Sequence, residues 1–528
     1  MKKVSDLLVN NNMKDTLQTT ILGALKNLSI EATAVVLEHP ADLSHGDYST
    51  NAALAYAKAA GMNPRALAEK IVAEILQNKP EEIESVEIAG PGFINFRLSG
   101  AFFAVTTEQI LVNADIWGTN HILAGKKVMV EYTQPNPFKP FHIGHLMSNA
   151  IGESISRIVE ACDAQTVRAN YQGDIGPHVA KAIYKILEKG KPSSELSVTE
   201  QAKYIGACYS EGSAAYESEP VAKAAIDAIN KKVYDKSDAA INEAYDWGRA
   251  ITLDAFEELY AMLGTRFDHY FFESEMAPIG MEIVRKHVGS VFAESEGAIV
   301  FHAGEHDPKL HTRVFINSQG LPTYETKEIG LTVTKFEKEN PDLSIVTTAI
   351  EQGEYMKVVQ KAISLIYPDY ESRMKHVTHG MMRFASGKMS SRKGNVVAGD
   401  ELVRDAMEIV REKMLEREFT DTERETIARQ VAVAAVKYSI LKQATGGDII
   451  YDFEKSISFE GDSGPYIQYT AVRAAAVLGR GEKEGIALST LVPHEWQATA
   501  LEKYLYRFPE VVVRAYESLE PHHIATYL

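Results

Sequence analysis

The feature that most constrains the fold is a strand–helix–strand pattern that begins at residue 127. Residues 127–132 form an apolar run, which is typical of a buried parallel strand. A helical pattern follows at 148–161, and residues 166–171 form a second strand-like run. Two strands joined by a helix predict a βαβ unit, the start of a nucleotide-binding α/β sheet. Further strand-like runs at 298–302, 312–317, 343–348 and 376–382 fit the same class.

The rest of the chain divides around this pattern. A chain of 528 residues is long enough for several domains. Residues 1–115 mix helical periodicity at 15–27 and 64–77 with a strand-like run after Gly90-Pro91-Gly92, which predicts an α+β unit. We place the α/β unit at 116–400, with a polar helical insertion at about 180–260. Residues 401–528 show helical spacing throughout and predict an all-α unit.

Composition narrows the possible environments. Two cysteines, Cys162 and Cys208, are too few for a disulfide framework and fit a reducing compartment. The N-terminus does not resemble a secretion signal, and no apolar run is long enough to span a bilayer. We therefore expect a cytoplasmic protein with no membrane contact. The net charge of −17 argues against non-specific DNA binding, although an acidic protein can still carry a local basic face.

Two motifs contain the candidate residues for catalysis. The first, His142-Ile143-Gly144-His145, follows the first strand and opens a helix. Backbone N–H groups and the helix dipole favour an anion there, Gly144 permits close approach, and two imidazoles can donate to phosphate oxygens. By itself the tetrapeptide is weak evidence, because a pair of ordinary turn histidines would look the same.

The second motif is a compact basic segment late in the same α/β unit. It consists of Lys388, Met389, Ser390, Ser391 and Arg392. A loop of this kind can close over a triphosphate and stabilise the transition state, although most charge clusters are only solvated loops. The two motifs in this order indicate chemistry at the α-phosphate of ATP.

This pair resembles the HIGH and KMSKS signatures of class I aminoacyl-tRNA synthetases. Residues 131–146 and 170–176 closely resemble the arginyl-tRNA synthetase versions, and 45–51, 90–96 and 459–469 resemble other segments of that family. The resemblance implies a Rossmann-type catalytic domain with a helical insertion, an α+β N-terminal domain at the tRNA elbow and an all-α anticodon-binding domain. The sequence stops in what looks like mid-helix, so we expect the last domain to be incomplete or naturally short.

The resemblance also implies an activity. The enzyme would be an arginine–tRNA ligase, which activates L-arginine with ATP to arginyl-adenylate and then transfers arginine to the 3′ end of tRNA(Arg). ATP would be a substrate, with Mg²⁺ on its phosphates. The expected partners are tRNA(Arg), L-arginine and ATP, with no DNA, and the expected state is a monomer. Family members generally need bound tRNA before they activate the amino acid.

Residue roles carry over position by position. Lys139, His142, His145 and Lys388 are the expected catalytic residues, and His142, Gly144, His145 and 388–392 the expected ATP site. The family pattern has a second lysine where this chain has Ser391, and Lys139 is expected to supply that charge, although Arg392 or Lys393 could also serve. The expected arginine site consists of Glu131, Asn136, Glu273, Tyr324, Glu328 and Gln352. Glu328 stands where the family commonly has aspartate. Asp174 lies in a segment that the family places beside the site, or it could simply cap a helix.

Other functions remain open at this point. Another class I synthetase, for cysteine or glutamate, would share both motifs. The sequence has no Cys/His cluster with zinc-ligand spacing, which weakens the cysteine version, and we expect no metal bound by the protein itself. A small-molecule adenylate-forming ligase would leave the N-terminal and C-terminal units unexplained. A non-catalytic tRNA-binding paralogue is disfavoured by the intact His142, His145 and Lys388.

Overall fold

The computed structural model describes residues 13–384, 398–416, 418–487 and 496–528. The chain forms two compact units. One contains the N-terminal segment up to residue 120 together with 480–511, and the other contains 121–479 together with 512–528. We call them the N-terminal unit and the catalytic unit. No helix in the described part of the chain is long and apolar enough to cross a membrane.

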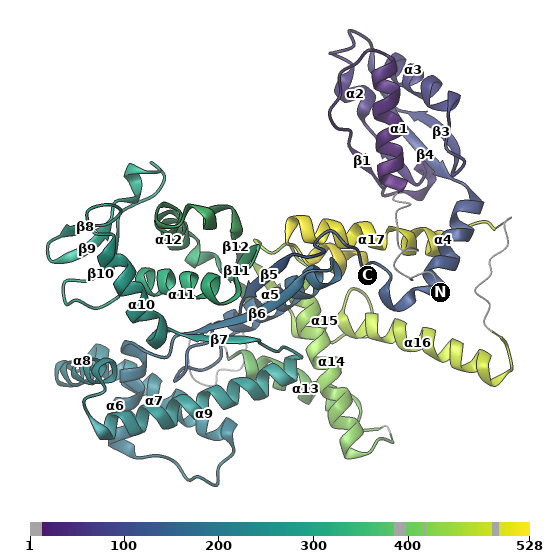
Figure 1. Cartoon of the computed structure of the whole chain (residues 1–528). Helices are drawn as coiled ribbons and strands as arrows, with labels where there is room; N and C mark the ends of the chain where they lie inside the picture. Colours follow the sequence, from purple (N-terminus) through teal and green to yellow (C-terminus); the bar gives the residue numbers. More distant parts are fainter. Residues whose placement is uncertain (1–12, 385–397, 417, 488–495) are drawn as a thin grey trace. The chain divides into compact units, whose positions relative to one another are not determined.

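A five-stranded sheet forms the centre of the catalytic unit (Figure 1). Its order is β12-β11-β5-β6-β7, and every neighbouring pair is parallel. The strands are β5 (Lys127–Glu131), β6 (Gln165–Gln172), β7 (His269–Phe272), β11 (Leu343–Ala349) and β12 (Met374–His379). Helix α5 (Ile143–Ala161) joins β5 to β6, which confirms the predicted βαβ unit. Strand β5 lies between β6 and β11, where the chain order reverses, and such switch points place ligands beyond the carboxyl ends of the strands.

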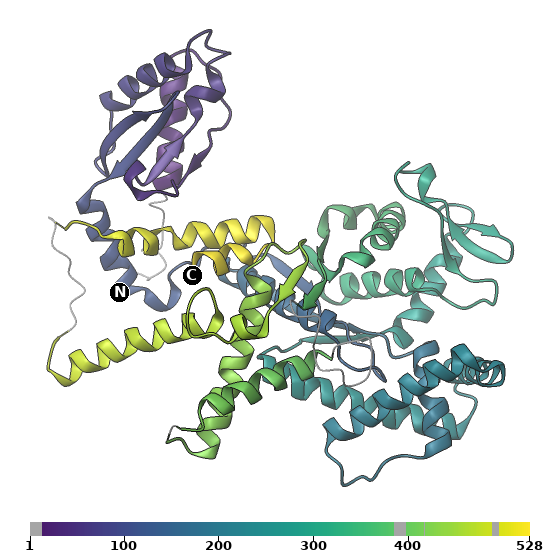
Figure 2. The same cartoon turned by 180° about the vertical axis from the view of Figure 1, so that it is seen from behind.

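The helical insertion separates β6 from β7. It contains α6 (Pro177–Lys189), α7 (Val198–Ser218), α8 (Pro220–Asp235) and α9 (Ala239–Leu263), close to the expected limits of 180–260. These helices share an apolar core that includes Val179, Ile183, Ile205, Ile226 and Ile241. The core explains why this polar-looking stretch folds, since each helix buries one apolar stripe. In both views the insertion lies on one side of the sheet (Figure 2).

Three more helices and a small sheet lie on the other side of the parallel sheet in these views. Helices α10 (Glu273–Lys286) and α11 (Tyr324–Glu339) pack against each other, and α12 (Gly353–Ile366) follows β11. Strands β8 (Ala293–Ser295), β9 (Ala298–Phe301) and β10 (Arg313–Ile316) form an antiparallel sheet. The strand-like runs at 298–302 and 312–317 are therefore strands, but they belong to this sheet and not to the parallel one.

After residue 398 the chain is mainly helical. Helices α13 (Gly399–Lys413) and α14 (Asp421–Leu441) pack against each other and against α5. They are followed by β14 (Ile449–Tyr451), α15 (Phe453–Ser456), α16 (Gly464–Lys483), α17 (Ala500–Ser518) and α18 (His522–Tyr527). Strand β13 (Met382–Phe384) pairs in parallel with β14. The helical character expected for 401–528 is confirmed, and the residues described there add the short strand β14.

The N-terminal unit is an antiparallel sheet covered by helices. The sheet has the order β1-β2-β4-β3, formed by β1 (Leu37–Glu38), β2 (Tyr48–Thr50), β3 (Ile83–Ala89) and β4 (Phe93–Leu98). Its helices are α1 (Met13–Asn27), α2 (Ala52–Tyr56), α3 (Pro64–Gln77) and α4 (Gly100–Val112). Gly90 and Gly92 both have positive φ in the β3–β4 turn, which glycine adopts without strain. The α+β class expected for this segment is confirmed.

Candidate active site

The loop after β5 carries the first motif to the edge of the sheet. Thr133, Gln134 and Phe138 have φ values of 79°, 48° and 68°, a backbone region that is costly for these residues. The surroundings hold the loop in place. Thr133 N donates to Ser148 Oγ at 3.0 Å, and the Phe138 ring is fully buried against the insertion. This strained but well-anchored loop leads directly into His142.

His142 and His145 form a reciprocal cap at the first turn of α5. His142 Nδ1 accepts from Gly144 N at 3.1 Å, and His145 Nδ1 accepts from His142 N at 3.2 Å. Since each Nδ1 is an acceptor, each neutral ring carries its proton on Nε2. Burial lowers the pKa of His142 to about 4, helped by the charge of Lys139, and lowers that of His145 as well. At neutral pH both rings are therefore uncharged Nε2–H donors.

Lys139 lies in the same electrostatic environment. Burial lowers the pKa of its ammonium, Glu273 opposes that shift, and Lys181 adds to it. The Lys139 Nζ atom lies 5.4 Å from the centroid of the Tyr209 ring, which comes from the insertion. The charge of Lys139 in turn lowers the pKa of His142 and of His145. The structure thus brings together the lysine and both histidines of the first motif.

The second motif lies outside the described residues. Lys388, Met389, Ser390, Ser391, Arg392 and Lys393 all fall within 385–397. The residues that follow it are described, and they contact the first motif. Ala398 forms an antiparallel bridge with His142, and Gly399 N donates to Phe141 O at 2.7 Å. The described residues that follow the second motif, more than two hundred residues from the first motif in the sequence, are therefore joined to the first motif through backbone contacts.

Three buried glutamates converge beside this site from three elements. Glu131 ends β5, Glu273 begins α10 and Glu328 lies on α11. Two of them have a lysine partner: Lys335 Nζ lies 2.6 Å from Glu131 Oε2, and Lys327 Nζ lies 2.6 Å from Glu273 Oε2. The third, Glu328, accepts a 3.3 Å hydrogen bond from the Tyr355 hydroxyl. Within this described cluster, three carboxylates therefore have two ammonium partners.

This imbalance changes the ionisation of Glu328. Burial and then the neighbouring charges of Glu131 and Glu273 raise the pKa of Glu328 to about 8, while Lys335 opposes the shift. The hydroxyl of Tyr171 on β6 is buried without a hydrogen-bond partner among the described residues. Burial, together with Glu273 and Glu328, raises the pKa of that tyrosine as well. The pocket thus contains three glutamates and two paired lysines, so one glutamate lacks a cation among the described residues. The Tyr171 hydroxyl is available as a further hydrogen-bonding group.

Asn136 and Glu273 approach each other over Gly173. A Cβ atom on Gly173 would lie 2.2 Å from Asn136 Oδ1 and 3.1 Å from Glu273 Oε1, so a larger residue there would displace the Asn136 amide. Tyr324 begins α11 and is 63% exposed, with Lys327 Nζ 5.1 Å from its ring centroid. Gln352 ends the 3₁₀ turn Ile350–Gln352 and is exposed. Five of the six expected arginine-site residues therefore belong to the cluster or border it, whereas Gln352 is exposed on the turn after β11.

Asp174 is buried and forms hydrogen bonds with the first turn of α10. It is fully buried and accepts from Ser274 N at 2.9 Å, from Ser274 Oγ at 2.8 Å and from Tyr245 Oη at 3.1 Å. Arg249 Nε lies 3.0 Å from the same carboxylate. Asp174 therefore caps α10 at the residue after Glu273, although a hundred residues separate it from that helix. Both of its oxygens accept hydrogen bonds, and its bonds to Ser274 hold the residue next to Glu273.

Sequence reasoning did not single out several groups of this site. The acidic cluster is completed by Lys327, Lys335, Tyr171 and Tyr355. Buried His379, at the end of β12, lowers the pKa of His145 through its charge. One signal was available: Glu328, Leu331 and Lys335 recur at helical spacing on the buried face of α11. A lysine on such a face indicates a buried ion pair, because an unpaired one would be too costly.

The parallel sheet, the histidine cap on α5 and the acidic pocket define the catalytic domain of a class I aminoacyl-tRNA synthetase. Residues 106–453 match the family model of class I (R) tRNA synthetase catalytic domains. Residues 15–98 match the arginyl-tRNA synthetase N-terminal domain, and 467–528 match the DALR anticodon-binding domain. The chain therefore belongs to the arginyl-tRNA synthetase family, and its activity is that of an arginine–tRNA ligase.

Individual relatives agree with this assignment. The chain is 32% identical over 498 residues to an arginine–tRNA ligase of Fusobacterium nucleatum, covering 92% of this chain and 84% of the relative. An arginine–tRNA ligase of Clostridium acetobutylicum is 28% identical, covering 96% and 89%. Among solved structures, Thermus thermophilus arginyl-tRNA synthetase superposes with a TM-score of 0.79 at 23% identity, covering 97% of this chain and 89% of that one. The Plasmodium falciparum enzyme gives 0.77 at 19% identity, covering 98% and 90%. These two structures support the fold.

Proposed function

We propose that the acidic cluster is the arginine pocket and that Glu328 binds the guanidinium group. The observation that supports this most strongly is the missing cation: Glu131 and Glu273 each have a lysine, and Glu328 has none among the described residues. A guanidinium supplies one positive charge and a planar fork of N–H donors. Tyr171 and Tyr355 provide hydroxyls beside the same carboxylate. Asn136, Glu131 and Glu273 would then face the α-amino and carboxyl end, with Tyr324 and Gln352 at the rim.

On the nucleotide side, the proposed catalytic groups are His142, His145, Lys139 and Lys388, with Gly144 and 388–392 completing the ATP site. The arginine carboxylate attacks the α-phosphate, and pyrophosphate leaves. As negative charge develops, the Nε2–H groups of both histidines donate to phosphate oxygens, and Lys139 adds a cation. Because both rings are neutral, they act as fixed dipoles that do not need to lose a proton.

Mg²⁺ belongs with the nucleotide in this proposal. Among the described residues, Glu131 and Glu273 are each paired with a lysine, and the acids of the pocket are not among the groups that could hold a metal ion, which suits an ion carried by the triphosphate. Bound there, Mg²⁺ supplies charge neutralisation on the phosphates.

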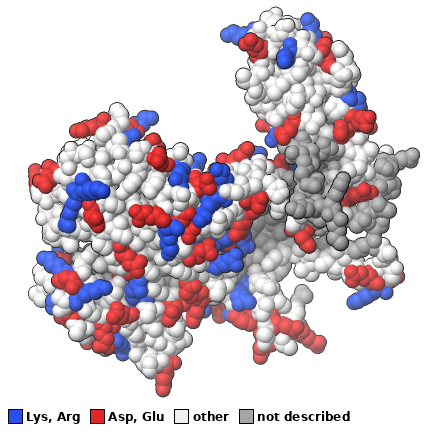
Figure 3. Space-filling view, viewed as in Figure 1, with Lys and Arg blue, Asp and Glu red and all other residues white. Residues whose placement is uncertain are grey.

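We further propose three functional domains: residues 1–115 contacting the tRNA elbow, 116–400 for catalysis, and 401–528 for the anticodon. Lysines and arginines are interspersed with acids on the face shown in Figure 3. Local basic side chains, and not the net charge of −17, would therefore contact tRNA(Arg). A monomer in the cytoplasm is the proposed working state; two buried cysteines that form no disulfide suit a reducing compartment.

Pyrophosphate exchange tests this proposal. We expect exchange with arginine, dependent on tRNA(Arg), and none with cysteine or glutamate. Lys139→Ala should lower the exchange rate by about 10²–10³-fold, with little change in ATP binding, because its charge is used mainly in the transition state. Lys185→Ala, which removes a half-buried lysine paired with Glu188, is the matched control and should leave exchange unchanged. Exchange with another amino acid, or an unchanged rate for Lys139→Ala, would contradict the assignment.

A further inference from the structure

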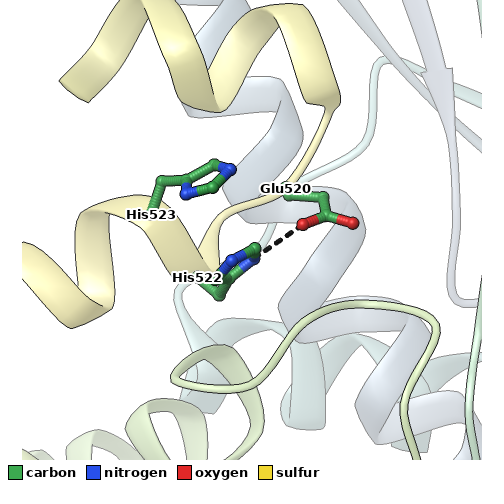
Figure 4. Close-up of side chains that lie close together, drawn as sticks. All are labelled: Glu520, His522 and His523. Carbon is green, nitrogen blue, oxygen red and sulfur yellow. Dashed lines mark ion pairs between the residues drawn. The ribbon is translucent and has the colours of Figure 1, made fainter. Parts of the chain in front are cut away.

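A cluster of two histidines and a glutamate lies where α17 ends and α18 begins. Glu520, His522 and His523 each present one potential ligand atom, and these atoms all lie within 4.8 Å of one another (Figure 4). All three residues are partly buried. We propose that this cluster is a binding site for a divalent metal ion of the zinc type, with two imidazoles and one carboxylate as ligands.

The backbone of the connecting turn fixes the three residues. Leu519 has a φ of 55° and is buried, and Glu520 N donates to Ala515 O at 3.0 Å, which ends α17. Ile524 N donates to Pro521 O at 3.0 Å, which starts α18. Tyr438 on α14 donates to Ala525 O at 3.2 Å. The ligands are therefore presented by a short segment held at both ends, which reduces the entropic cost of binding an ion.

The contact between His522 and Glu520 is the second observation. His522 Nδ1 lies 2.9 Å from Glu520 Oε2, yet this buried nitrogen has no hydrogen bond of acceptable geometry among the described residues. A buried polar atom of this kind needs a partner. Ligand atoms on one zinc ion lie about 3.3 Å apart, since each bond is about 2.0–2.1 Å. Small side-chain rotations would bring a third ligand to the same point and leave a fourth position open to water.

His523 supplies the third ligand. Its ring centroid lies 4.1 Å from that of His522, with an interplanar angle of 39°. An imidazole binds a metal through the lone pair of its neutral form. Arg514 and Glu520 are charged groups that face this ring. The nearby charge of Arg514 weakens cation binding, which the Glu520 carboxylate offsets. Imidazole and carboxylate together suit Zn²⁺ and Co²⁺ better than Mg²⁺ or Ca²⁺.

A bound ion would join the end of α17 to the start of α18.

The test is titration of the metal-free protein with Zn²⁺ by calorimetry. Absorption spectra with Co²⁺ would show whether the ion is bound by a tetrahedral set of ligands. We expect the His522→Ala/His523→Ala double variant to lose one equivalent of Zn²⁺ and the tetrahedral Co²⁺ bands, and Glu520→Gln to weaken binding by at least about tenfold. Zn²⁺ should raise the melting temperature of the wild type and not of the double variant.

The matched control is His121→Ala. His121 also forms a pair with a carboxylate, Asp163, at 2.7 Å, and within the described residues this pair has no third ligand. It should bind Zn²⁺ like the wild type. Identical stoichiometry and affinity in the wild type and the double variant, or no Zn²⁺ uptake by the wild type, would overturn the proposal. Unchanged circular dichroism of the metal-free variants shows that loss of binding does not reflect misfolding.

Discussion

At the scale of single residues, the acidic pocket makes arginine binding dependent on pH. Glu328 has a pKa of about 8 in the unliganded protein because it is buried beside Glu131 and Glu273. A guanidinium binds the ionised form, so a proton must leave as arginine enters. The affinity for arginine should therefore rise about tenfold per pH unit from pH 6 towards 8 and then level off. Calorimetry in buffers of different ionisation enthalpy should detect the released proton.

Glu328→Gln provides the decisive comparison. It should abolish the pH dependence between 6 and 8 and weaken arginine binding by about 10–100-fold. The folded-state pKa lies above the unfolded value of 4.5, so the carboxyl group costs stability as pH rises from about 4.5 to 8. The variant should consequently melt higher than the wild type at pH 7.5. Glu354→Gln, at an exposed acid paired with Lys357, is the control. A persistent pH dependence in Glu328→Gln would assign the titration to another group.

The sequence revealed the identities of the site residues more readily than their pairing. His142 and His145 stood out because of their spacing, and the structure places them as expected at the start of α5. The ion pairs of Glu131 with Lys335 and of Glu273 with Lys327 join residues 204 and 54 positions apart. No local pattern specifies which lysine meets which acid over such separations, because the tertiary packing of α10 and α11 decides it.

At the scale of elements, periodicity identified the strands and helices that are long or buried on one side. Strand β7 was missed because His269–Phe272 is short and has no alternating pattern. The two runs at 298–302 and 312–317 were recognised as strands, but their sheet could not be assigned from sequence, since antiparallel pairing of β9 and β10 depends on the loop between them. Helix α10 illustrates a further limit: its N-terminal cap comes from a distant segment.

That distant cap gives a prediction for α10. Asp174→Ala would leave Arg249 without its partner and Ser274 N without its acceptor. Removing the acceptor of a buried hydrogen bond costs about 1–3 kcal/mol, so urea unfolding should occur at lower concentration. Glu273 begins the same helix, so the KM for arginine should rise more than kcat falls. Asp174→Asn, which keeps an acceptor oxygen, should recover part of both effects.

The control for this helix is Asp227→Ala in the insertion. Asp227 also accepts from a tyrosine hydroxyl, that of Tyr216 at 3.1 Å, but it is exposed. Its removal should change stability by less than about 0.5 kcal/mol. If Asp174→Ala lowers stability and leaves the KM for arginine unchanged, the cap stabilises the fold without positioning Glu273.

At the scale of the whole molecule, sequence-based boundaries could not anticipate how the N-terminal unit is completed. Part of α17, which lies near the end of the chain, packs onto the N-terminal sheet and helices. Its Lys503 Nζ lies 2.9 Å from Asp47 Oδ1, and its Tyr506 hydroxyl lies 2.6 Å from that of Tyr48. Asp47 lies in the segment 45–51, which resembles the family, and it is a buried partner of Lys503. A segment matched to the anticodon-binding domain therefore shares a core with the N-terminal domain.

Glu510 lies at the centre of this packing and provides its test. The carboxylate accepts from Tyr48, and it lies 3.3 Å from His39 Nε2 and 3.5 Å from Lys14 Nζ. Burial opposes its ionisation, but its bonds to His39 and Tyr48 prevail and lower its pKa. Its stabilising effect is therefore present above about pH 4.5 and is lost at lower pH as the carboxylate is protonated.

Glu510→Ala should loosen the N-terminal unit in the full-length enzyme. We expect faster amide hydrogen exchange in β2 and β4, because both strands lie in the sheet that α17 covers. The KM for tRNA(Arg) should rise several-fold, since both proposed tRNA-binding segments meet in this unit, while the KM for ATP at saturating tRNA stays the same. Glu502→Ala is the control, because Glu502 bonds only to Thr499 at the start of its own helix among the contacts described. Unchanged exchange in β2 and β4 would show that α17 covers the N-terminal unit without stabilising it.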